Sequence, residues 1–496
     1  MLMNILKRLS GCERGSAIPL IALALFATVG MTGLAVDSGR AYLVQQRLLT
    51  AIDAAGLAAG STVSTQNVQA EVEKYLAANY PDGYVDSSVV NVVATPNDDN
   101  TVIHVTATAT LPTVFMGIFG HHEMSVQAES EVTRTQKGLE VVMVLDVTGS
   151  MDDSLGGGVT KLSAAKGAAH DMLDILYGNR ETVDDLWVGM VPFSQAVNVG
   201  TSKKAWLDPV DFASRNWGTT SWGGCVEARE LDGRDTTDDT PTDQPFKAYY
   251  WPDHDSYNNW VRVTAVPIYQ QVCTPRYCGS GRNRRQCGET CTNQVVGYNY
   301  VTNYVINSTS GPNKYCPQAV TPLTASKSTV DAAIDTLTAQ GNTHIVTGAV
   351  WGWRMLSPDW RGFWGGEMNT NNLPLDYNTP LMNKAVVLMT DGDNTISNST
   401  SGAYGYLSDG RLGTTSSSTA VTRLNDRLQT VCTRMKEQNI TVYTVAFGTA
   451  INTTSRNMLR DCASQSDYFF DSPTNEDLQR AFRMIGDSLA NLRVSR

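Results

Sequence analysis

The sequence predicts a mixed α/β protein with an N-terminal transmembrane helix, a small α+β module and a doubly wound, Rossmann-like α/β domain that carries a Cys/Trp-rich insertion. Three observations predict it. An uncharged apolar run covers residues 15–36, strand-type alternation follows between residues 65 and 135, and from Leu139 continuous apolar strands alternate with helices. A chain of 496 residues is long enough for two or three domains.

The first element is the apolar run at residues 15–36, of which we expect about 16–36 to lie in the membrane. About twenty residues at ~1.5 Å each cross a hydrocarbon core of roughly 30 Å, and the run is too long for the apolar core of a cleaved signal peptide. A buried core helix is the alternative. Basic residues precede the run and predict a cytoplasmic N-terminus, namely Lys7, Arg8 and Arg14. Arg40 and Arg47 on the far side count against that orientation. We expect the helix to continue to about residue 60.

The net charge and the cysteines limit the classes of binding partner and the cellular compartment that fit this chain. The chain has 38 Lys+Arg and 49 Asp+Glu, a net charge of −11, which argues against nucleic acid as the main partner. Of nine cysteines, Cys12 stands alone and eight lie between Cys225 and Cys462. An even set of this kind is typical of disulfides in an oxidising compartment, which agrees with export of the region after the helix.

Residues 61–137 form the small module. We expect one helix at 68–80 and an antiparallel sheet of three strands at 89–96, 101–112 and 124–134, with the apolar link VFMGIFG before the last strand. The three histidines His104, His121 and His122 could be taken for metal ligands. Exposed polar residues on a strand and a turn are the favoured interpretation.

Residues 138–496 form the large domain. Buried strands are expected at 139–146, 186–193, 384–391, 441–447 and 466–472, and helices at 161–177, 329–339, 343–356, 422–438 and 475–492. The insertion at about 200–320 holds six cysteines and five tryptophans with little periodicity, which indicates a disulfide-stapled region. The Ser/Thr/Gly-rich residues 397–418 predict a flexible loop. Ligands of such domains bind beyond the carboxyl ends of the strands.

Oxygen-bearing side chains stand at that edge of the sheet. Asp146, Thr148 and Ser150 follow the strand at 139–146, and Asp391 follows the strand at 384–391. Thr343 opens a helix in a third loop, and Asp393 is a possible accessory ligand. An all-oxygen set suits a hard cation such as Mg²⁺. A cluster of helix caps is the alternative interpretation of the DVTGS segment.

The N-terminal segments RGSAIPLIALAL and GLAVDSGRAYLVQQRLLTAIDAAGLAAG resemble the TadE/TadG proteins of bacterial Flp/Tad pilus assembly. The resemblance implies a pilin-like small module, pilus-assembly partners and a single-pass anchor in the bacterial inner membrane, with the bulk of the chain periplasmic or otherwise extracytoplasmic. Processed pseudopilins carry Glu five residues after the cleaved Gly. Leu20 holds that place after Gly15, so we expect the anchor to be retained.

The loops with oxygen ligands resemble the metal-ion-dependent adhesion site (MIDAS) of von Willebrand factor A domains, over roughly 138–198 and 320–490. The family pattern is DxSxS, a later Thr, and an Asp in a TDG-type loop, and here Thr148 replaces the usual Ser. The resemblance implies Mg²⁺, or Mn²⁺ or Ca²⁺, with Thr148 and Ser150 as direct ligands and Thr343 bound directly or through water. Asp146 and Asp391 would act mostly through water. An acidic group of a protein partner would then complete the coordination.

The cysteines are assigned in part. The resemblance to TadG-like chains implies a Cys432–Cys462 bond, and Cys225 with Cys316 would close the insertion at its base. The inner four, Cys273, Cys278, Cys287 and Cys291, favour disulfides over zinc, and their pairing stays open. The tryptophans of the insertion form either a small core or a surface for a sugar or a partner.

Three functions follow from these observations. The favoured one is a membrane-anchored, divalent-cation-dependent protein-binding component of Flp/Tad pilus assembly that is not an enzyme. The alternative is a surface adhesin that binds a host, matrix or sugar ligand through the same metal. The third is a Mg-dependent phosphoesterase with Asp146 as nucleophile, but enzymes of the haloacid-dehalogenase type carry a second Asp where this chain has Thr148. No phosphate-binding P-loop occurs in the sequence.

Overall fold

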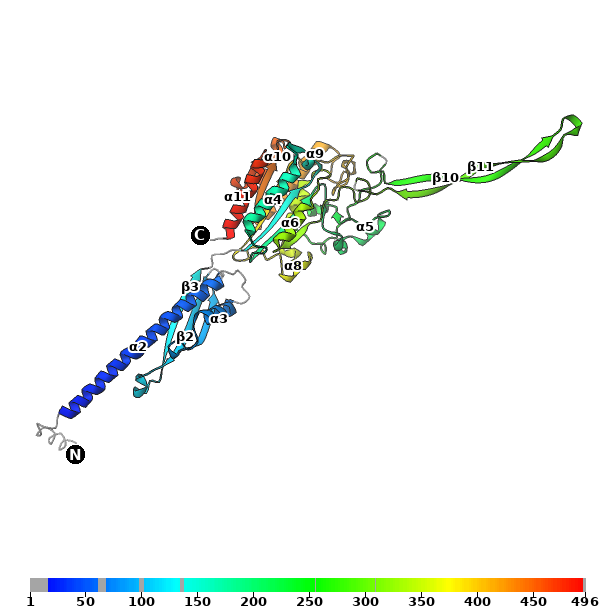
Figure 1. Ribbon diagram of the computed structural model, residues 1–496. Coiled ribbons are helices and arrows are strands. Elements are labelled where there is room, and N and C mark those ends of the chain that lie inside the picture. The colour runs from blue at the N-terminus through cyan, green and yellow to red at the C-terminus, as the bar shows by residue number, and fades with distance from the viewer. Residues whose placement is uncertain are drawn as a thin grey trace.

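The computed structural model describes residues 17–60, 68–97, 102–133, 138–254, 256–307 and 309–493. A long helix leads into a small α+β module, and a large α/β domain follows with an arm of two strands that extends away from it (Figure 1). Cys12, Gly15 and the basic residues before the apolar run lie outside the described residues, so retention and orientation of the anchor stay predictions.

The helix α2 runs without a break from Ala17 to Gly60 over 44 residues. It is long and apolar enough to cross a membrane. Its first half is bare, with side chains such as Ile18 and Leu23 more than two-thirds exposed at 75% and 72%. Its second half is different, because Val44 and Leu48 are fully buried in the core of the small module. The helical extension is therefore part of that module.

The small module has the elements that alternation predicts. They are α3 (Val68–Asn79), β1 (Ser88–Pro96), β2 (Val102–Pro112) and β3 (Glu123–Thr133), and the strands pair antiparallel in the order β1-β2-β3. The second half of α2 packs on this sheet and on α3. Arg40 donates to the Pro112 carbonyl at 2.9 Å, and Arg47 donates to the Asn79 carbonyl at 2.8 Å. These two arginines therefore hold the module on the helix.

The three histidines of the module are exposed. His104 lies on β2, and His121 and His122 lie in the turn between β2 and β3. His104 stands 3.8 Å from a carboxylate oxygen of Glu131 across the β2–β3 pair. The described part of the chain brings no set of three metal-ligating side chains together around any of them.

An eight-stranded sheet organises the large domain, in the order β15-β14-β13-β4-β7-β8-β9 with β12 beside β7. The strands β15, β14, β13, β4 and β7 are parallel, and β8, β9 and β12 are antiparallel additions. The strands are β4 (Gly138–Asp146), β7 (Leu186–Phe193), β8 (Val197–Asn198), β9 (Cys225–Val226), β12 (Thr321–Thr324), β13 (Met382–Thr390), β14 (Ile440–Phe447) and β15 (Phe469–Ser472).

Helices cover both faces of this sheet (Figure 1). One layer holds α4 (Lys161–Tyr177), α6 (Lys327–Asp335) and α11 (Asn475–Arg493), and the other holds α7 (Ile345–Leu356), α9 (Ser417–Glu437) and α10 (Thr453–Cys462). Shorter elements are α5 (Pro209–Ser214), α8 (Gly366–Thr370) and the β5–β6 pair (Ser154–Gly156, Val159–Thr160). On β4, Val142 and Val144 face the α7 layer, whereas Val141 and Met143 face the α4 layer. Burial on both faces explains the continuous apolar pattern of the central strands.

The insertion differs from its prediction, because it contains two of the longest strands. β10 (Val261–Cys278) and β11 (Arg285–Tyr304) pair antiparallel and form the projecting arm (Figure 1). Both faces of the arm are exposed, including Tyr269, Tyr298 and Tyr300. Period-two alternation arises when one face of a strand is buried. The arm buries neither face, and so its sequence carries little periodicity.

The rest of the insertion packs onto the domain. Four of its tryptophans are buried, namely Trp206, Trp222, Trp251 and Trp260. Trp206 stacks on Trp351 of α7 at 6.3 Å between ring centroids and meets Trp360 edge-on at 5.3 Å. The insertion therefore shares the core on the α7 face, and these four rings are not an exposed sugar-binding surface.

The segment 397–418 is also more ordered than its composition predicts. Ala403, Tyr404 and Leu407 are buried in it. Arg411 bonds Glu227 and Glu230 of the insertion at 2.8 and 2.7 Å. A Ser/Thr/Gly-rich stretch is flexible only where its backbone lacks partners, and here the insertion supplies them.

Candidate metal centre

The strand β4 and the turn that follows it bring three candidate oxygen ligands to the edge of the sheet, Asp146, Thr148 and Ser150. Asp146 ends the strand and is fully buried. One of its carboxylate oxygens accepts from the Thr148 N–H at 2.8 Å, and the other accepts from the hydroxyl of Thr390, the last residue of β13, at 2.6 Å. Thr148 Oγ1 lies 3.0 Å from Ser150 Oγ. The turn thus places two hydroxyl groups side by side above a fixed carboxylate.

The strand β13 delivers the second carboxylate. Asp391 follows it and is also fully buried. Its Oδ1 accepts from Ser150 Oγ at 2.7 Å, so the two loops meet directly. Its Oδ2 accepts from the ammonium of Lys161, the first residue of α4, at 2.8 Å. Lys161 also contacts Asp153 at 3.1 Å.

The third loop brings Thr343 to the same place. Gly149 donates its N–H to the Gly341 carbonyl at 2.9 Å, and Gln340 donates to the Val147 carbonyl at 2.7 Å, which joins this loop to the end of β4. A methyl group at Gly392 would lie 3.7 Å from Thr343 Oγ1 and 3.9 Å from Ser150 Oγ. The five residues expected as ligands, Asp146, Thr148, Ser150, Thr343 and Asp391, are therefore brought together from three loops.

The charge balance of this cluster suits a divalent cation. Burial, and next the charge of Asp391, raises the pKa of Asp146 to about 7. Burial lowers the pKa of the Lys161 ammonium, but its hydrogen bonds with Asp391 and Asp153 and their negative charges have the larger effect. The pKa of Lys161 is therefore raised. The buried lysine thus pairs with Asp391, while Asp146 bonds only neutral groups, the Thr148 N–H and the Thr390 hydroxyl. Three neutral hydroxyls complete an all-oxygen set of the type that Mg²⁺ prefers, so the residues fit the metal.

Two residues of this centre escaped the sequence analysis, and one expected residue turns elsewhere. Lys161 and Thr390 contact the two aspartates, although neither belongs to the motif. Asp393 accepts from Asn452 Nδ2 at 2.6 Å and from its N–H at 3.2 Å. Asn452 is the N-cap of α10. The carboxylate of Asp393 therefore holds the first residue of that helix and does not face the candidate metal ligands.

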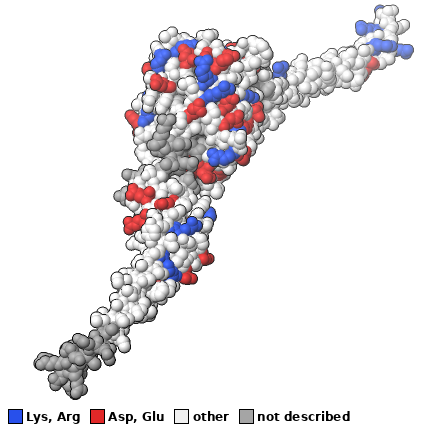
Figure 2. All heavy atoms as spheres, turned by 60° about the vertical axis from the view of Figure 1, so that its left-hand side comes forward, with Lys and Arg blue, Asp and Glu red and all other residues white. Residues whose placement is uncertain are grey.

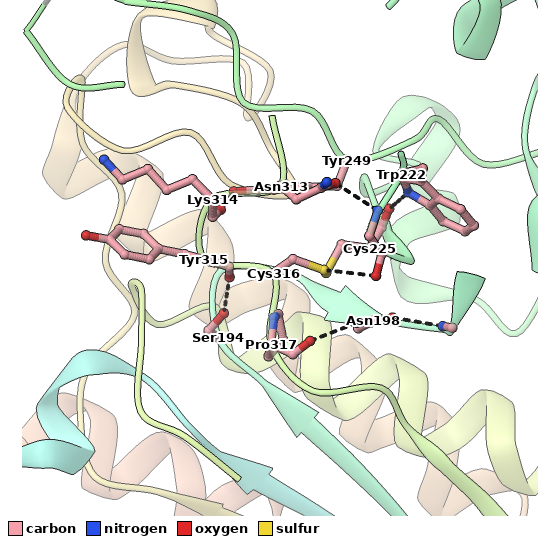
Figure 3. The surroundings of a disulfide bond; sticks show 12 residues. Ser194, Asn198, Trp222, Cys225, Tyr249, Asn313, Lys314, Tyr315, Cys316 and Pro317 are labelled. Carbon is pink, nitrogen blue, oxygen red and sulfur yellow. Dashed lines mark hydrogen bonds between the residues drawn. A yellow bond between two sulfur atoms is a disulfide. The ribbon is translucent and has the colours of Figure 1, made fainter. Parts of the chain in front are cut away.

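An open cleft adjoins the cluster, and the insertion forms one of its walls. Gly149, Asp152, Gln340 and Asn342 line it from the metal loops, and Tyr315 lines it from the insertion. The Cys225–Cys316 bond holds that wall in place (Figure 3). Next to the bond, the Tyr315 carbonyl accepts from Ser194 Oγ at 3.2 Å, and the Pro317 carbonyl accepts from Asn198 Nδ2 at 2.8 Å.

The structure pairs all eight downstream cysteines. Cys432 bonds Cys462 and Cys225 bonds Cys316, as expected. The pairing that the sequence left open is Cys273–Cys291 and Cys278–Cys287, both across the arm. Glu289 lies beside the first of these two bonds. The sulfur atoms are used in disulfides, so the arm does not present the zinc site that the spacing also allowed.

Three solved structures illustrate how distantly this chain resembles known proteins. The vWF domain of the type V pili tip protein Mfa5 from Porphyromonas gingivalis has 10% identity, covers 73% of this chain and 97% of that chain, and has a TM-score of 0.34. The pilus adhesin SpaC from Lactobacillus rhamnosus GG has 11% identity, 82% and 34% coverage and a TM-score of 0.33. Proximal thread matrix protein 1 from the mussel byssus, with a zinc-occupied MIDAS motif, has 11% identity, 72% and 46% coverage and a TM-score of 0.30.

These TM-scores are low, and the likenesses establish neither the fold nor the function of this chain. The chain spans less than half the length of the SpaC and byssus proteins, at 34% and 46%. No curated protein matches it. One family model matches, and it covers the segment that contains α2: residues 15–62 match the Tad family, described as Flp pilus-assembly TadE/G-like.

Proposed function

We propose that this protein is a membrane-anchored, extracytoplasmic component of Flp/Tad pilus assembly that binds a protein partner through a divalent cation. The observation that carries the proposal is the meeting of three loops around two buried carboxylates and three hydroxyls at the carboxyl edge of the sheet. The match of residues 15–62 to the Tad family supports the pilus context and the anchor. We place the anchor in the bacterial inner membrane and the α/β domain in the periplasm.

The proposed coordination uses neutral groups next to the ion. Thr148 and Ser150 bind Mg²⁺ directly, Thr343 binds directly or through water, and Asp146 and Asp391 hold the metal's waters. A cation with few charged ligands keeps most of its charge. It can then accept a carboxylate from a partner that enters the cleft between Gly149 and Tyr315. Mn²⁺ or Ca²⁺ could serve in the same oxygen set.

The burial of Asp146 argues against a phosphoesterase. A nucleophilic carboxylate has to reach the phosphorus of a bulky ester, whereas the side chain of Asp146 is fully buried. Each of its oxygens accepts one hydrogen bond, from Thr148 or Thr390, and keeps a lone pair that can accept from a metal-bound water. We therefore infer a binding function. The alternative, a surface adhesin for a host, matrix or sugar ligand, would use the same metal, and only the identity of the captured partner separates it from the first proposal.

Calorimetry on the full chain in detergent micelles tests the metal. Asp146→Ala should weaken Mg²⁺ binding by at least 10–100-fold, the usual loss when a group that positions a metal's ligands is removed. Asp393→Ala is the matched control and should bind like wild type, because that carboxylate faces Asn452. Binding by Asp146→Ala at the wild-type affinity, or no binding of Mg²⁺, Mn²⁺ or Ca²⁺ by wild type, would refute the proposal.

A capture experiment with the same variants tests the partner. Wild type should retain pilus-assembly proteins in the presence of Mg²⁺, release them with EDTA, and fail to retain them when Asp146 is replaced by Ala. Retention of a host or matrix ligand under the same conditions, without any pilus component, would establish the adhesin alternative. Partner retention that is unchanged by EDTA would contradict a role for the metal.

A further inference from the structure

The turn between β2 and β3 lies against the apolar half of α2 (Figure 1). The Phe119 ring meets the Phe26 ring edge-on, at 5.3 Å between centroids. A methyl group at Gly30 would lie 3.2 Å from the Phe119 ring, and one at Gly33 would lie 2.5 Å from Phe115 Cβ. The two glycines therefore form the surface on which this turn, residues 113–122, is seated.

The position of these contacts along α2 has a consequence for the membrane. Asp37 is the first charged residue after the apolar run, and Phe26 precedes it by eleven residues. Eleven residues correspond to about 16 Å of helix, against a hydrocarbon core of about 30 Å. A turn that touches Phe26 lies well below the level of Asp37. If α2 crosses the bilayer through its apolar run, the turn must enter the same leaflet beside it.

The side chains of the turn suit that environment. Residues 113–120 include no charged side chain. Val114 and Ile118 are 56% and 71% exposed, and Phe119 is 38% exposed. In water these apolar groups would be left unburied. Beside α2 they continue the exposed apolar surface of Ile18–Val36, which has no other cover among the described residues.

Seven backbone N–H groups of the turn have partners within the protein, which is what the bilayer demands of polar groups. The carboxylate of Asp37, itself 1% exposed, accepts three consecutive N–H groups, from Val114, Phe115 and Met116, at 2.8, 3.0 and 2.8 Å. Four further N–H groups donate to carbonyls within the turn, namely those of Thr113, Ile118, Gly120 and His121.

We propose that residues 113–120, the apolar part of this turn, form a second membrane-inserted element, which packs on Gly30 and Gly33 of α2 and is immersed in the leaflet on the side of the small module. Asp37 closes the turn's backbone at the membrane surface. Arg40 fixes its base through the Pro112 carbonyl. The AVDSGR segment is thereby explained as the clamp that holds this turn. The inference rests on the membrane anchor of the proposed function.

Fluorescence quenching in phosphatidylcholine vesicles tests the inference with the full chain. A bimane label on Ile118→Cys should be quenched by doxyl-labelled lipid and shielded from aqueous iodide. The matched control is Val90→Cys, an exposed site at 58% on β1 of the same module, which should show the reverse. Leu23→Cys reports on α2 itself. All three labelled variants also carry Cys12→Ser, so that the introduced cysteine is the one free thiol; the other eight cysteines are paired in disulfides.

The outcomes separate the turn from the anchor. Lipid quenching at Leu23→Cys without lipid quenching at Ile118→Cys would overturn the inserted turn and keep the anchor, whereas loss of both would overturn the anchor as well. The label at Ile118→Cys could instead be shielded from iodide without being quenched by lipid. If that shielding increased with the amount of protein per vesicle, a second copy of the chain would cover the turn, and the inference would be overturned. Gly33→Leu should displace the turn and expose the label to iodide, whereas Gly39→Leu should not, since no atom lies within 4 Å of a methyl group at Gly39.

Discussion

The Cys432–Cys462 bond should carry a large share of the stability of the α/β domain. It joins α9 to the last residue of α10, and the strand β14 lies between these helices in the chain. The bond closes a loop of 30 residues. In the chain-entropy treatment, a crosslink of this span lowers the free energy of the folded state relative to the unfolded chain by about 3.5 kcal/mol. Replacing both cysteines by alanine should lower the free energy of unfolding by about that amount.

The double alanine variant also removes two sulfur atoms from the core, because both cysteines are fully buried. A small cavity term therefore adds to the crosslink term. The matched control is the pair Cys278→Ala and Cys287→Ala. That bond closes only 9 residues at the exposed end of the arm, where β10 and β11 contact each other and bury neither face. Removing it should leave the unfolding of the α/β domain unchanged.

Guanidinium unfolding of the full chain, followed by the fluorescence of the buried tryptophans such as Trp351 and Trp360, measures both variants. The loss of about 3.5 kcal/mol should appear as a lower midpoint at constant slope. An unfolding free energy within about 1 kcal/mol of wild type would refute the crosslink argument, given the typical range of 2–4 kcal/mol for native disulfides. Free thiols at Cys432 and Cys462 in the full chain purified without reductant would refute the bond itself.

Two further predictions concern the metal centre. Because burial and then Asp391 raise the pKa of Asp146 to about 7 from 3.8, the folded metal-free protein holds this proton more tightly than the unfolded chain. The free energy of unfolding in EDTA should therefore fall by about 4 kcal/mol as the pH rises from about 4 to about 7, and urea titrations of Asp146→Asn should lack this loss. Lys161→Met should tighten Mg²⁺ binding in calorimetry on the order of tenfold, since an ammonium 2.8 Å from Asp391 repels the metal. Weaker binding by Lys161→Met would mean that the lysine is needed to orient Asp391.

The clustering of the candidate ligands could be predicted because these residues stand at fixed places relative to strands. Asp146 and Asp391 end apolar runs of the kind found in buried parallel strands, and the carboxyl ends of neighbouring parallel strands meet at one edge. In the structure β4 and β13 pair in parallel, so their carboxyl ends lie at the same edge of the sheet. Lys161 could not be found in this way. It begins α4, and its contact with Asp391 depends on how that helix packs against the sheet.

The arm and the turn at 113–122 escaped prediction for a different reason. Sequence patterns report the contrast between a buried and an exposed face, and β10 and β11 have no such contrast. The apolar link VFMGIFG was visible, but its contact with Phe26 joins residues 93 positions apart in the chain. The role of Asp37 as acceptor for three N–H groups likewise depends on a distant segment.

The insertion and the loop that carries Thr343 are separate in sequence, but the buried side chain of Gln195 bonds both of them. Gln195 follows β7, and its Oε1 accepts from the Asn342 N–H at 2.6 Å, one residue before Thr343. Its Nε2 donates to the Tyr249 hydroxyl of the insertion at 3.2 Å and to the Ser401 carbonyl at 3.1 Å. The loop that brings Thr343 to the cluster is therefore held by the insertion. A partner that displaced the insertion wall at Tyr315 would therefore act on the same hydrogen bonds and would change the position of Thr343, through which we propose that the metal is bound.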